Sequence, residues 1–169
     1  MIFTGHYQAN DIVSKHENGS TLYDIQTGST VSSPLPYRLI HYYNNDRLEV
    51  TTKYISGIYF DTKPVQDYAR DFLSPRLTNI FYYMMTNPPY NLSPALGTEG
   101  APFYTHGFMA HYAGDETLDP EEQAALMTWW NKIPGTNPYK SFMLQVPMTW
   151  WTDLNPPDNF MVFDLTTGR

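Results

Sequence analysis

The sequence predicts an α+β fold: antiparallel strands first, then a helical region and a short extended tail. Three observations support this order. Residues 1 to about 60 alternate between apolar and polar side chains, residues 65–85 have helical spacing, and residues 160–165 are again strand-like. We expect residues 1–60 to form a β portion and residues 61–169 a helical extension with C-terminal strands, packed with it as one unit.

The first part of the chain contains short segments that resemble the strands of an antiparallel sheet. Asn18-Gly19 is the dipeptide typical of a tight hairpin turn, and the polar turn at residues 44–46 separates another pair of strands. Gly28 ends the strand that follows the first hairpin turn. The expected strands cover residues 1–4, 12–16, 21–27, 37–43 and 47–55.

The helical region has clear boundary signals. A helix over residues 65–85 should end or kink at Pro75, because proline lacks the N–H that an α-helix needs. A second helix over residues 101–112 should be closed by Gly114.

The third helix has the clearest start. Asp119 is the expected N-cap, Pro120 takes the first helical position, and Glu122 would complete a capping box. This helix should end before Pro134-Gly135. Residues 142–146 and 160–165 then read as strands, separated by a loop over residues 152–159.

The composition of the chain argues against several classes of binding partner and of metal site. The net charge is −7 and the ten Lys and Arg residues form no basic stripe, so we expect no nucleic-acid partner. The longest apolar runs, such as residues 80–85, are too short to span a bilayer, so no membrane insertion is expected. The absence of cysteine excludes disulfides and thiolate metal sites. Any targeting signal would lie upstream of this chain.

Aromatic residues are abundant, with 14 Tyr, 9 Phe and 4 Trp. Because they are spread along the chain, the first interpretation is a core filled with large rings whose polar atoms each find one partner. The second is a surface that stacks on sugars or bases.

The most informative segment follows the first expected strand and reads Gly5-His6-Tyr7-Gln8. A glycine lets the backbone turn at a strand end, and a histidine held on a rigid element can offer a ring nitrogen to a divalent cation. The alternative is an ordinary histidine that bonds a nearby carbonyl.

This segment and its surroundings resemble the C-terminal part of a bacterial calcineurin-like metallophosphoesterase, whose last metal-binding motif reads Gly-His-x-His. The strand and Gly-Ser turn over residues 18–29, the segment Pro36-Tyr37-Arg38 and the tail over residues 152–168 are similar to that family as well. The resemblance implies a metallophosphoesterase-type sandwich for the β portion and a helical C-terminal extension after it.

The resemblance aligns His6 and Gln8 with metal ligands of the family. It implies divalent ions (Mn, Fe or Zn) and phosphate mono- or diesters as substrates. Gln8 stands where the family has a second histidine, and an amide oxygen binds late transition metals more weakly than imidazole does. The chain has no Asp-x-His and no Gly-Asn-His, so most ligands of the family's two-metal site are absent from it.

Two hypotheses about function follow. The chain is either the C-terminal portion of a metal-dependent phosphoesterase, inactive alone, or a non-catalytic module that presents an aromatic-rich surface to a protein or glycan. A weaker metal candidate is the cluster of His111, Asp115 and Glu116, for which solvated polar residues at a helix end are the commoner explanation.

The first expected strand, residues 1–4, suggests an interaction with another protein chain. The resemblance implies that the sheet neighbours of residues 1–4 come from an N-terminal half. Without them, Ile2 and Phe3 would form an uncovered apolar edge, so we expect self-association or pairing with an N-terminal partner chain.

Overall fold

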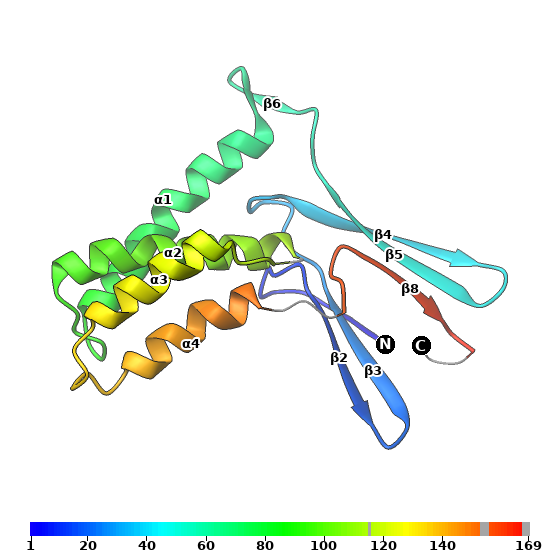
Figure 1. Ribbon diagram of the computed structural model, residues 1–169. Helices are drawn as coiled ribbons and strands as arrows, with labels where there is room; N and C mark the ends of the chain where they lie inside the picture. Colours follow the sequence, from blue (N-terminus) through cyan, green and yellow to red (C-terminus); the bar gives the residue numbers. More distant parts are fainter. Residues whose placement is uncertain (115, 153–155, 167–169) are drawn as a thin grey trace. The chain divides into compact units, whose positions relative to one another are not determined.

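The α+β class is confirmed. The computed structural model describes residues 1–114, 116–152 and 156–166, in which small sheets are followed by four helices and a C-terminal strand (Figure 1). The chain divides into two compact units: a β unit (residues 1–70, 111–115 and 154–169) and a helical unit (residues 71–110 and 116–153). Among the described residues, no helix is both long and apolar enough to cross a membrane.

The β unit contains two three-stranded sheets. In the first sheet, β1 (Ile2–Thr4) runs parallel to β3 (Ser20–Gln26), which pairs on its other side with β2 (Ile12–Glu17). In the second, β5 (Arg47–Tyr54) lies between β4 (Pro36–Tyr43) and β8 (Phe160–Asp164). Figure 1 shows the β2–β3 and β4–β5 hairpins diverging toward their turns.

Both hairpin turns form where turn residues were expected. Asn18 and Gly19 have φ values of 52° and 79°, the left-handed pair that a tight two-residue turn requires. Asp46 also has a positive φ, of 57°. A third small hairpin, β6 (Tyr59–Phe60) with β7 (Lys63–Pro64), has no counterpart among the predicted strands.

The core of the β unit is small and is shared by the two sheets. Ile12 and Ile25 from the first sheet pack with Val50 and Phe163 from the second, and all four are almost fully buried. Tyr23 adds an edge-on contact to Phe163, with ring centroids 4.9 Å apart. The two sheets therefore share one apolar core.

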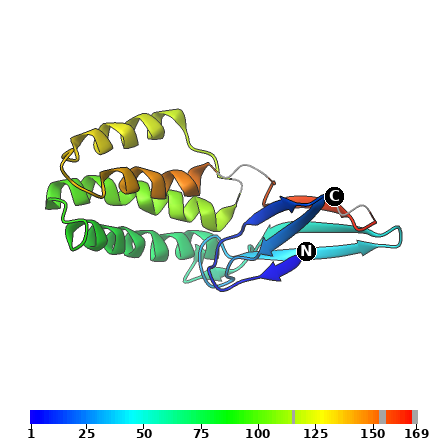
Figure 2. The same cartoon turned by 90° about the horizontal axis from the view of Figure 1, so that it is seen from below.

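The helices that form the helical unit run roughly side by side (Figure 2). They are α1 (Val65–Thr86) and α2 (Pro94–Ala113), whose first and last residues respectively belong to the β unit, with α3 (Pro120–Lys132) and α4 (Lys140–Trp151). Trp129 is fully buried at the centre of their core. A Cβ on Gly100 would lie only 2.2 Å from the Trp129 ring, so glycine allows α2 to approach this tryptophan.

The predicted end or kink of the first helix at Pro75 is wrong as an end, because α1 continues through this residue. Leu77, Phe81 and Met85 repeat every four residues and are buried beyond the proline. Burial of this apolar stripe outweighs the cost of about 3 kcal/mol that proline imposes on a helix interior.

The predicted start of the second helix needs correction. The second helix starts at Pro94 rather than at residue 101, because Ser93 Oγ accepts a hydrogen bond from the Leu96 N–H and Pro94 suits the first helical position. Its predicted end is confirmed, since Gly114 follows with a φ of +77°.

The predicted strand over residues 142–146 is wrong, because these residues lie in α4. Met143, Pro147 and Trp151 are its buried side chains, and their four-residue spacing places them on one face of a helix. The predicted loop over residues 152–159 lies partly outside the described residues.

The start of α3 confirms part of the expectation. Asp119 Oδ1 accepts from the N–H groups of Glu121 and Glu122, and Pro120 takes the first helical position. The Glu122 carboxylate contacts His106 Nδ1 at 2.8 Å, which differs from the reciprocal contact of a capping box.

Candidate functional site

The segment after β1 has an unusual backbone. His6 and Gln8 have φ values of 83° and 72°, in the left-handed region that side chains other than glycine rarely adopt. The prediction that Gly5 makes the turn is therefore wrong: the left-handed conformations belong to the two candidate ligand residues. Such a conformation costs about 1–3 kcal/mol per residue and persists only where the surroundings impose it.

Both candidate residues line one polar hollow. It has a volume of about 370 Å³, and its walls are His6, Gln8 and the turn over residues 27–30. The lining residues include Thr27, Ser29 and Thr30, but no acidic side chain. The structure thus brings His6 and Gln8 together with three hydroxyl groups.

Gly28 allows the turn to lie against the Gln8 segment. A Cβ at this position would lie 3.0 Å from the Gln8 carbonyl oxygen and 2.5 Å from Pro36 Cγ. The first is backbone and the second belongs to a rigid ring, so neither yields easily to an added methyl group. A residue with a side chain would push the turn outward and open the hollow.

Asn10 fixes the segment that carries His6 and Gln8. Its buried Nδ2 donates to Asn159 Oδ1 at 2.9 Å and to Thr52 Oγ1 at 3.1 Å. Its backbone N–H donates to the His111 carbonyl at 3.3 Å. One side chain therefore joins the segment to β5 and to the residue before β8, and the backbone joins it to the end of α2.

Arg38 on β4 provides a second anchor. Its guanidinium donates to the carbonyls of Gln26 at 2.8 Å, Asp11 at 3.3 Å and Asp158 at 2.7 Å. The buried Asp158 carboxylate in turn accepts from the Ile12 N–H at 2.7 Å. These bonds hold Asp11, the start of β2 and the end of β3 in one arrangement, and so fix the chain that follows the strained turn.

Tyr7, between the two candidate ligands, is also in contact with neighbours. Its ring packs edge-on against His111, with centroids 5.9 Å apart. Burial raises the pKa of the Tyr112 phenol, and the nearby Tyr7 phenol raises it further. These contacts add to the surroundings that hold the turn.

The Gln8 side chain is already engaged. Its Oε1 accepts a hydrogen bond from Ser32 Oγ at 2.7 Å. A carbonyl oxygen has two lone pairs, so this atom could still take part in one further contact. His6 is exposed, and its imidazole is the stronger donor for a transition metal.

A complete two-metal centre does not fit the described residues. None of them form a group of three or more His, Cys, Asp or Glu side chains that could hold a metal ion. His6 and Gln8 supply one imidazole and one amide oxygen, whereas a two-metal site needs several ligands and a bridging group. No catalytic step through a metal can be derived from these residues alone.

The other histidines are placed differently. His106 pairs with Glu122, His16 Nδ1 lies 3.0 Å from Thr21 Oγ1, and His41 packs on Tyr43 with ring centroids 4.2 Å apart. The predicted weaker cluster includes Asp115, which lies outside the described residues.

The sequence identified His6 and Gln8 but not the rest of the hollow. Gly28-Ser29 was recognised as the end of a strand and, by the resemblance, as a Gly-Ser turn, but its place beside Gln8 follows from the folded β unit. The position of Asn10 in the sequence could have indicated its role, since a polar residue shortly before an apolar strand often anchors a turn.

The aromatic residues follow the first interpretation only in part. The indole N–H groups of Trp129 and Trp130 donate to the carbonyls of Leu96 and Lys140, and the Tyr104 hydroxyl donates to the Met143 carbonyl. These rings lie in or against the helical core with their polar atoms paired. Many other rings are exposed, among them Tyr59 and Tyr83.

Comparison with protein-family models and with curated proteins finds no match to this chain.

Proposed function

We propose that this chain is the C-terminal portion of a metal-dependent phosphoesterase, in which His6 provides an imidazole ligand and Gln8 an amide oxygen. The observation that carries the proposal is the polar hollow in which these two residues meet in left-handed conformations. Strain of this kind, imposed on an exposed histidine and a half-buried glutamine by a network of anchors, is typical of functional sites.

The resemblance to calcineurin-like phosphoesterases gives the hollow its chemistry. By that resemblance, the β unit is the closing part of a metallophosphoesterase-type sandwich, the ions are Mn, Fe or Zn, and the substrates are phosphate mono- or diesters. The hydroxyl groups of Ser29 and Thr30 and the lack of acidic lining residues suit an anionic substrate beside His6.

The isolated chain should have negligible activity, because it brings one imidazole and one amide to a reaction that needs two coordinated ions. We expect no metal-dependent hydrolysis of a chromogenic phosphodiester in the presence of Mn²⁺ or Zn²⁺. Turnover that requires metal and disappears in His6→Ala would show that the chain holds a complete centre.

The DNA that precedes this coding sequence tests the proposal independently of any assay. We expect a reading frame that encodes Asp-x-His and Gly-Asn-His motifs. When the two segments are produced together, His6→Ala should remove metal-dependent turnover, whereas His16→Ala, a surface histidine of the same unit, should leave it unchanged. Absence of those motifs would contradict the proposal.

We further propose that β1 pairs with another chain, either a second copy or an N-terminal partner. β1 pairs only with β3 among the described strands, and Ile2 and Phe3 are 48% and 47% exposed. Phe3 lies opposite the core residue Ile25 in the parallel register, yet it is far less buried. An edge with exposed apolar residues is a template for strand pairing.

Sedimentation velocity at low micromolar concentration tests this pairing. We expect species larger than a monomer, and Ile2→Ser should shift them toward the monomer. Val31→Ser is the matched control, because Val31 is 86% exposed but lies in a loop. A wild-type chain that remains monomeric would contradict the pairing of β1 with a second copy.

A second candidate function, a non-catalytic binding module, is favoured by one separate observation: a large apolar cavity in the helical unit. Its wall disfavours a glycan, because sugars need several hydrogen-bonding groups and this wall offers few.

A further inference from the structure

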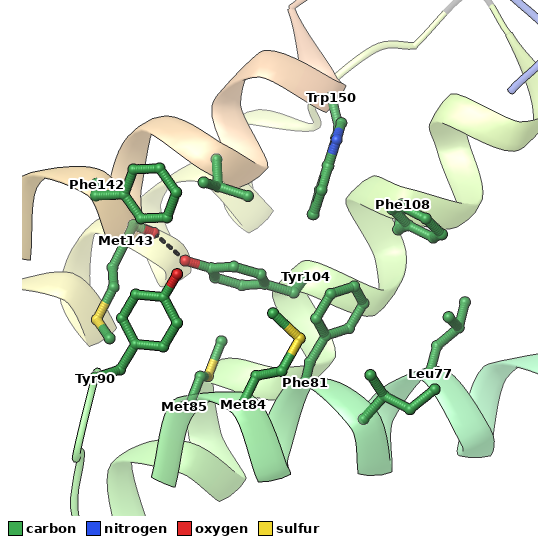
Figure 3. Close-up of a pocket in the computed structure, with 12 residues that line it drawn as sticks. Leu77, Phe81, Met84, Met85, Tyr90, Tyr104, Phe108, Phe142, Met143 and Trp150 are labelled. Carbon is green, nitrogen blue, oxygen red and sulfur yellow. Dashed lines mark hydrogen bonds between the residues drawn. The ribbon is translucent and has the colours of Figure 1, made fainter. Parts of the chain in front are cut away.

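The helical unit contains a cavity of about 430 Å³ between α1, α2 and α4 (Figure 3). The space is open to solvent on one side, so it is an apolar pocket of the helical unit and not a sealed void. It lies within the range of volumes that small-molecule sites occupy.

The wall of the cavity carries no charge. Aromatic rings form one part of it: Phe81 lies 5.8 Å from Phe108, and Phe108 lies 5.1 Å from Trp150, between ring centroids. The flexible thioethers of Met84 and Met143 form another part. Such a wall excludes carboxylates, phosphates and ammonium groups, because a charge would be desolvated there without a partner.

Two tyrosine hydroxyls bring polarity to this wall, and they differ. The Tyr104 hydroxyl donates to the Met143 carbonyl at 2.6 Å. Burial raises the pKa of this phenol, and Tyr90 raises it further, so Tyr104 stays neutral and its proton is engaged.

The Tyr90 hydroxyl lies near the hydroxyl end of Tyr104 in Figure 3. Its ring is held by Phe142, which stacks at 6.1 Å, and by Tyr139, whose ring packs edge-on at 5.3 Å. Among the described residues, no hydrogen bond is made by the Tyr90 hydroxyl. It is therefore a positioned polar group at the edge of an apolar space.

The opening of the cavity is also apolar. Ile80, Met84 and Phe142 line it and are about half exposed. Water would find almost no hydrogen-bonding partners there, whereas a hydrocarbon would be removed from water on the sides that the wall covers.

We propose that this cavity binds an uncharged, largely hydrocarbon small molecule with one hydrogen-bonding group, which contacts the Tyr90 hydroxyl. The volume sets the size of the ligand, the uncharged wall sets its polarity, and Tyr90 sets where its single polar group lies. This site lies wholly within the helical unit and does not depend on the role proposed for His6.

A pair of fluorescent probes tests the polarity. N-phenyl-1-naphthylamine is an uncharged aromatic with one N–H, and 8-anilino-1-naphthalenesulfonate has the same skeleton with a sulfonate added. We expect the neutral probe to bind one per chain and saturably, with a Kd on the order of micromolar. The sulfonate should bind at least about tenfold more weakly, because its charge cannot enter the uncharged wall.

Matched variants locate the binding. Val146→Phe adds volume to the wall of the cavity and should abolish saturable binding of the neutral probe. Tyr90→Phe removes only the hydroxyl and should weaken binding by about three- to tenfold, the effect of one lost hydrogen bond. Tyr83→Phe is the control for both: Tyr83 lies on α1, is 67% exposed and does not line the cavity, so it should leave the Kd unchanged.

Several results would overturn the proposal. Equal binding of the two probes would assign them to exposed apolar surface, and unchanged binding in both Val146→Phe and Tyr90→Phe would place the ligand elsewhere. If Val146→Phe fails to fold, as its circular dichroism would show, Tyr90→Phe decides alone. If Val146→Phe instead converts an oligomer to a monomer in sedimentation, a side chain of a second copy fills the cavity.

Discussion

The two units of this chain are stabilised in different ways. The β unit has a small apolar core of four nearly fully buried residues, and it adds polar anchors such as Asn10 and Arg38, which bond to residues distant in the sequence. The helical unit has a large core built from aromatic rings, and it tolerates a cavity of about 430 Å³ within it. Directional hydrogen bonds can hold a strained turn in one geometry. Apolar packing constrains mainly the shape and volume of the side chains that fill the core.

This difference indicates which kind of functional site each unit suits. The β unit holds two polar side chains in a costly backbone conformation at an open hollow, which suits coordination or catalysis. The helical unit has an open pocket with an uncharged, apolar wall, which suits binding of an apolar ligand. The two proposals therefore rest on separate residues and can fail separately.

The largest effect should come from the centre of the helical core. Trp129→Ala removes a fully buried ring that packs against Gly100 and bonds to Leu96, so we expect a loss of about 3–5 kcal/mol in the free energy of unfolding. Chemical denaturation followed by tryptophan fluorescence and circular dichroism measures it. A loss below about 1 kcal/mol would mean that the helical unit does not depend on this core.

The polar anchor of the β unit should matter less for stability but more for the site. Asn10→Ala removes the bonds to Thr52 and Asn159 and leaves the buried Thr52 hydroxyl without this donor, whereas Asn159 Oδ1 keeps the hydrogen bond from the Tyr54 hydroxyl, so we expect destabilisation by about 1–3 kcal/mol. Asn18→Gly, which keeps a positive φ in an exposed turn, is the control and should change stability by much less.

In Asn10→Ala, NMR shifts of the His6 and Gln8 amides should also change. If those signals stay in place, the turn is held by other contacts and the role assigned to Asn10 is wrong.

The smallest effect should come from a helix cap. Asp119→Ala removes the acceptor for the N–H groups of Glu121 and Glu122, so we expect a loss of about 1 kcal/mol. Thermal unfolding measures the shift, and Ser93→Ala at the start of α2 provides a second cap of the same kind. An unchanged melting temperature in Asp119→Ala would show that the first turn of α3 contributes nothing to stability.

Local signals predicted the strands of the β unit well. Asn18-Gly19 needs no distant contact to adopt a left-handed turn, and alternation over residues 47–55 specifies which side chains face the core. The same holds for Asp119, whose cap lies within a few residues of its partners.

Local sequence signals could not predict the elements whose structure depends on long-range packing. Residues 142–146 are apolar enough for a strand, and only burial of Met143 and Trp151 among the other helices makes this segment helical. Pro75 likewise remains inside α1 because the residues after it are buried.

The candidate site shows the same division. His6 and Gln8 were found from a short motif, but Gly28 is twenty residues from Gln8, and Asn159 is 149 residues from Asn10. Their approach is a property of the folded β unit. Only the two side chains that share a motif could therefore be predicted.

The central claim is that the hollow beside β1 holds His6 ready to bind a metal ion. Imidazole NMR signals during titration with Co²⁺, which is paramagnetic and binds imidazole more tightly than Mn²⁺, test this most directly. His16 and His41, exposed on strands of the same unit, are the internal controls. We predict that His6 broadens at lower Co²⁺ concentration than either control, and that Gln8→Ala reduces this preference. Equal broadening of the three histidines would contradict the account.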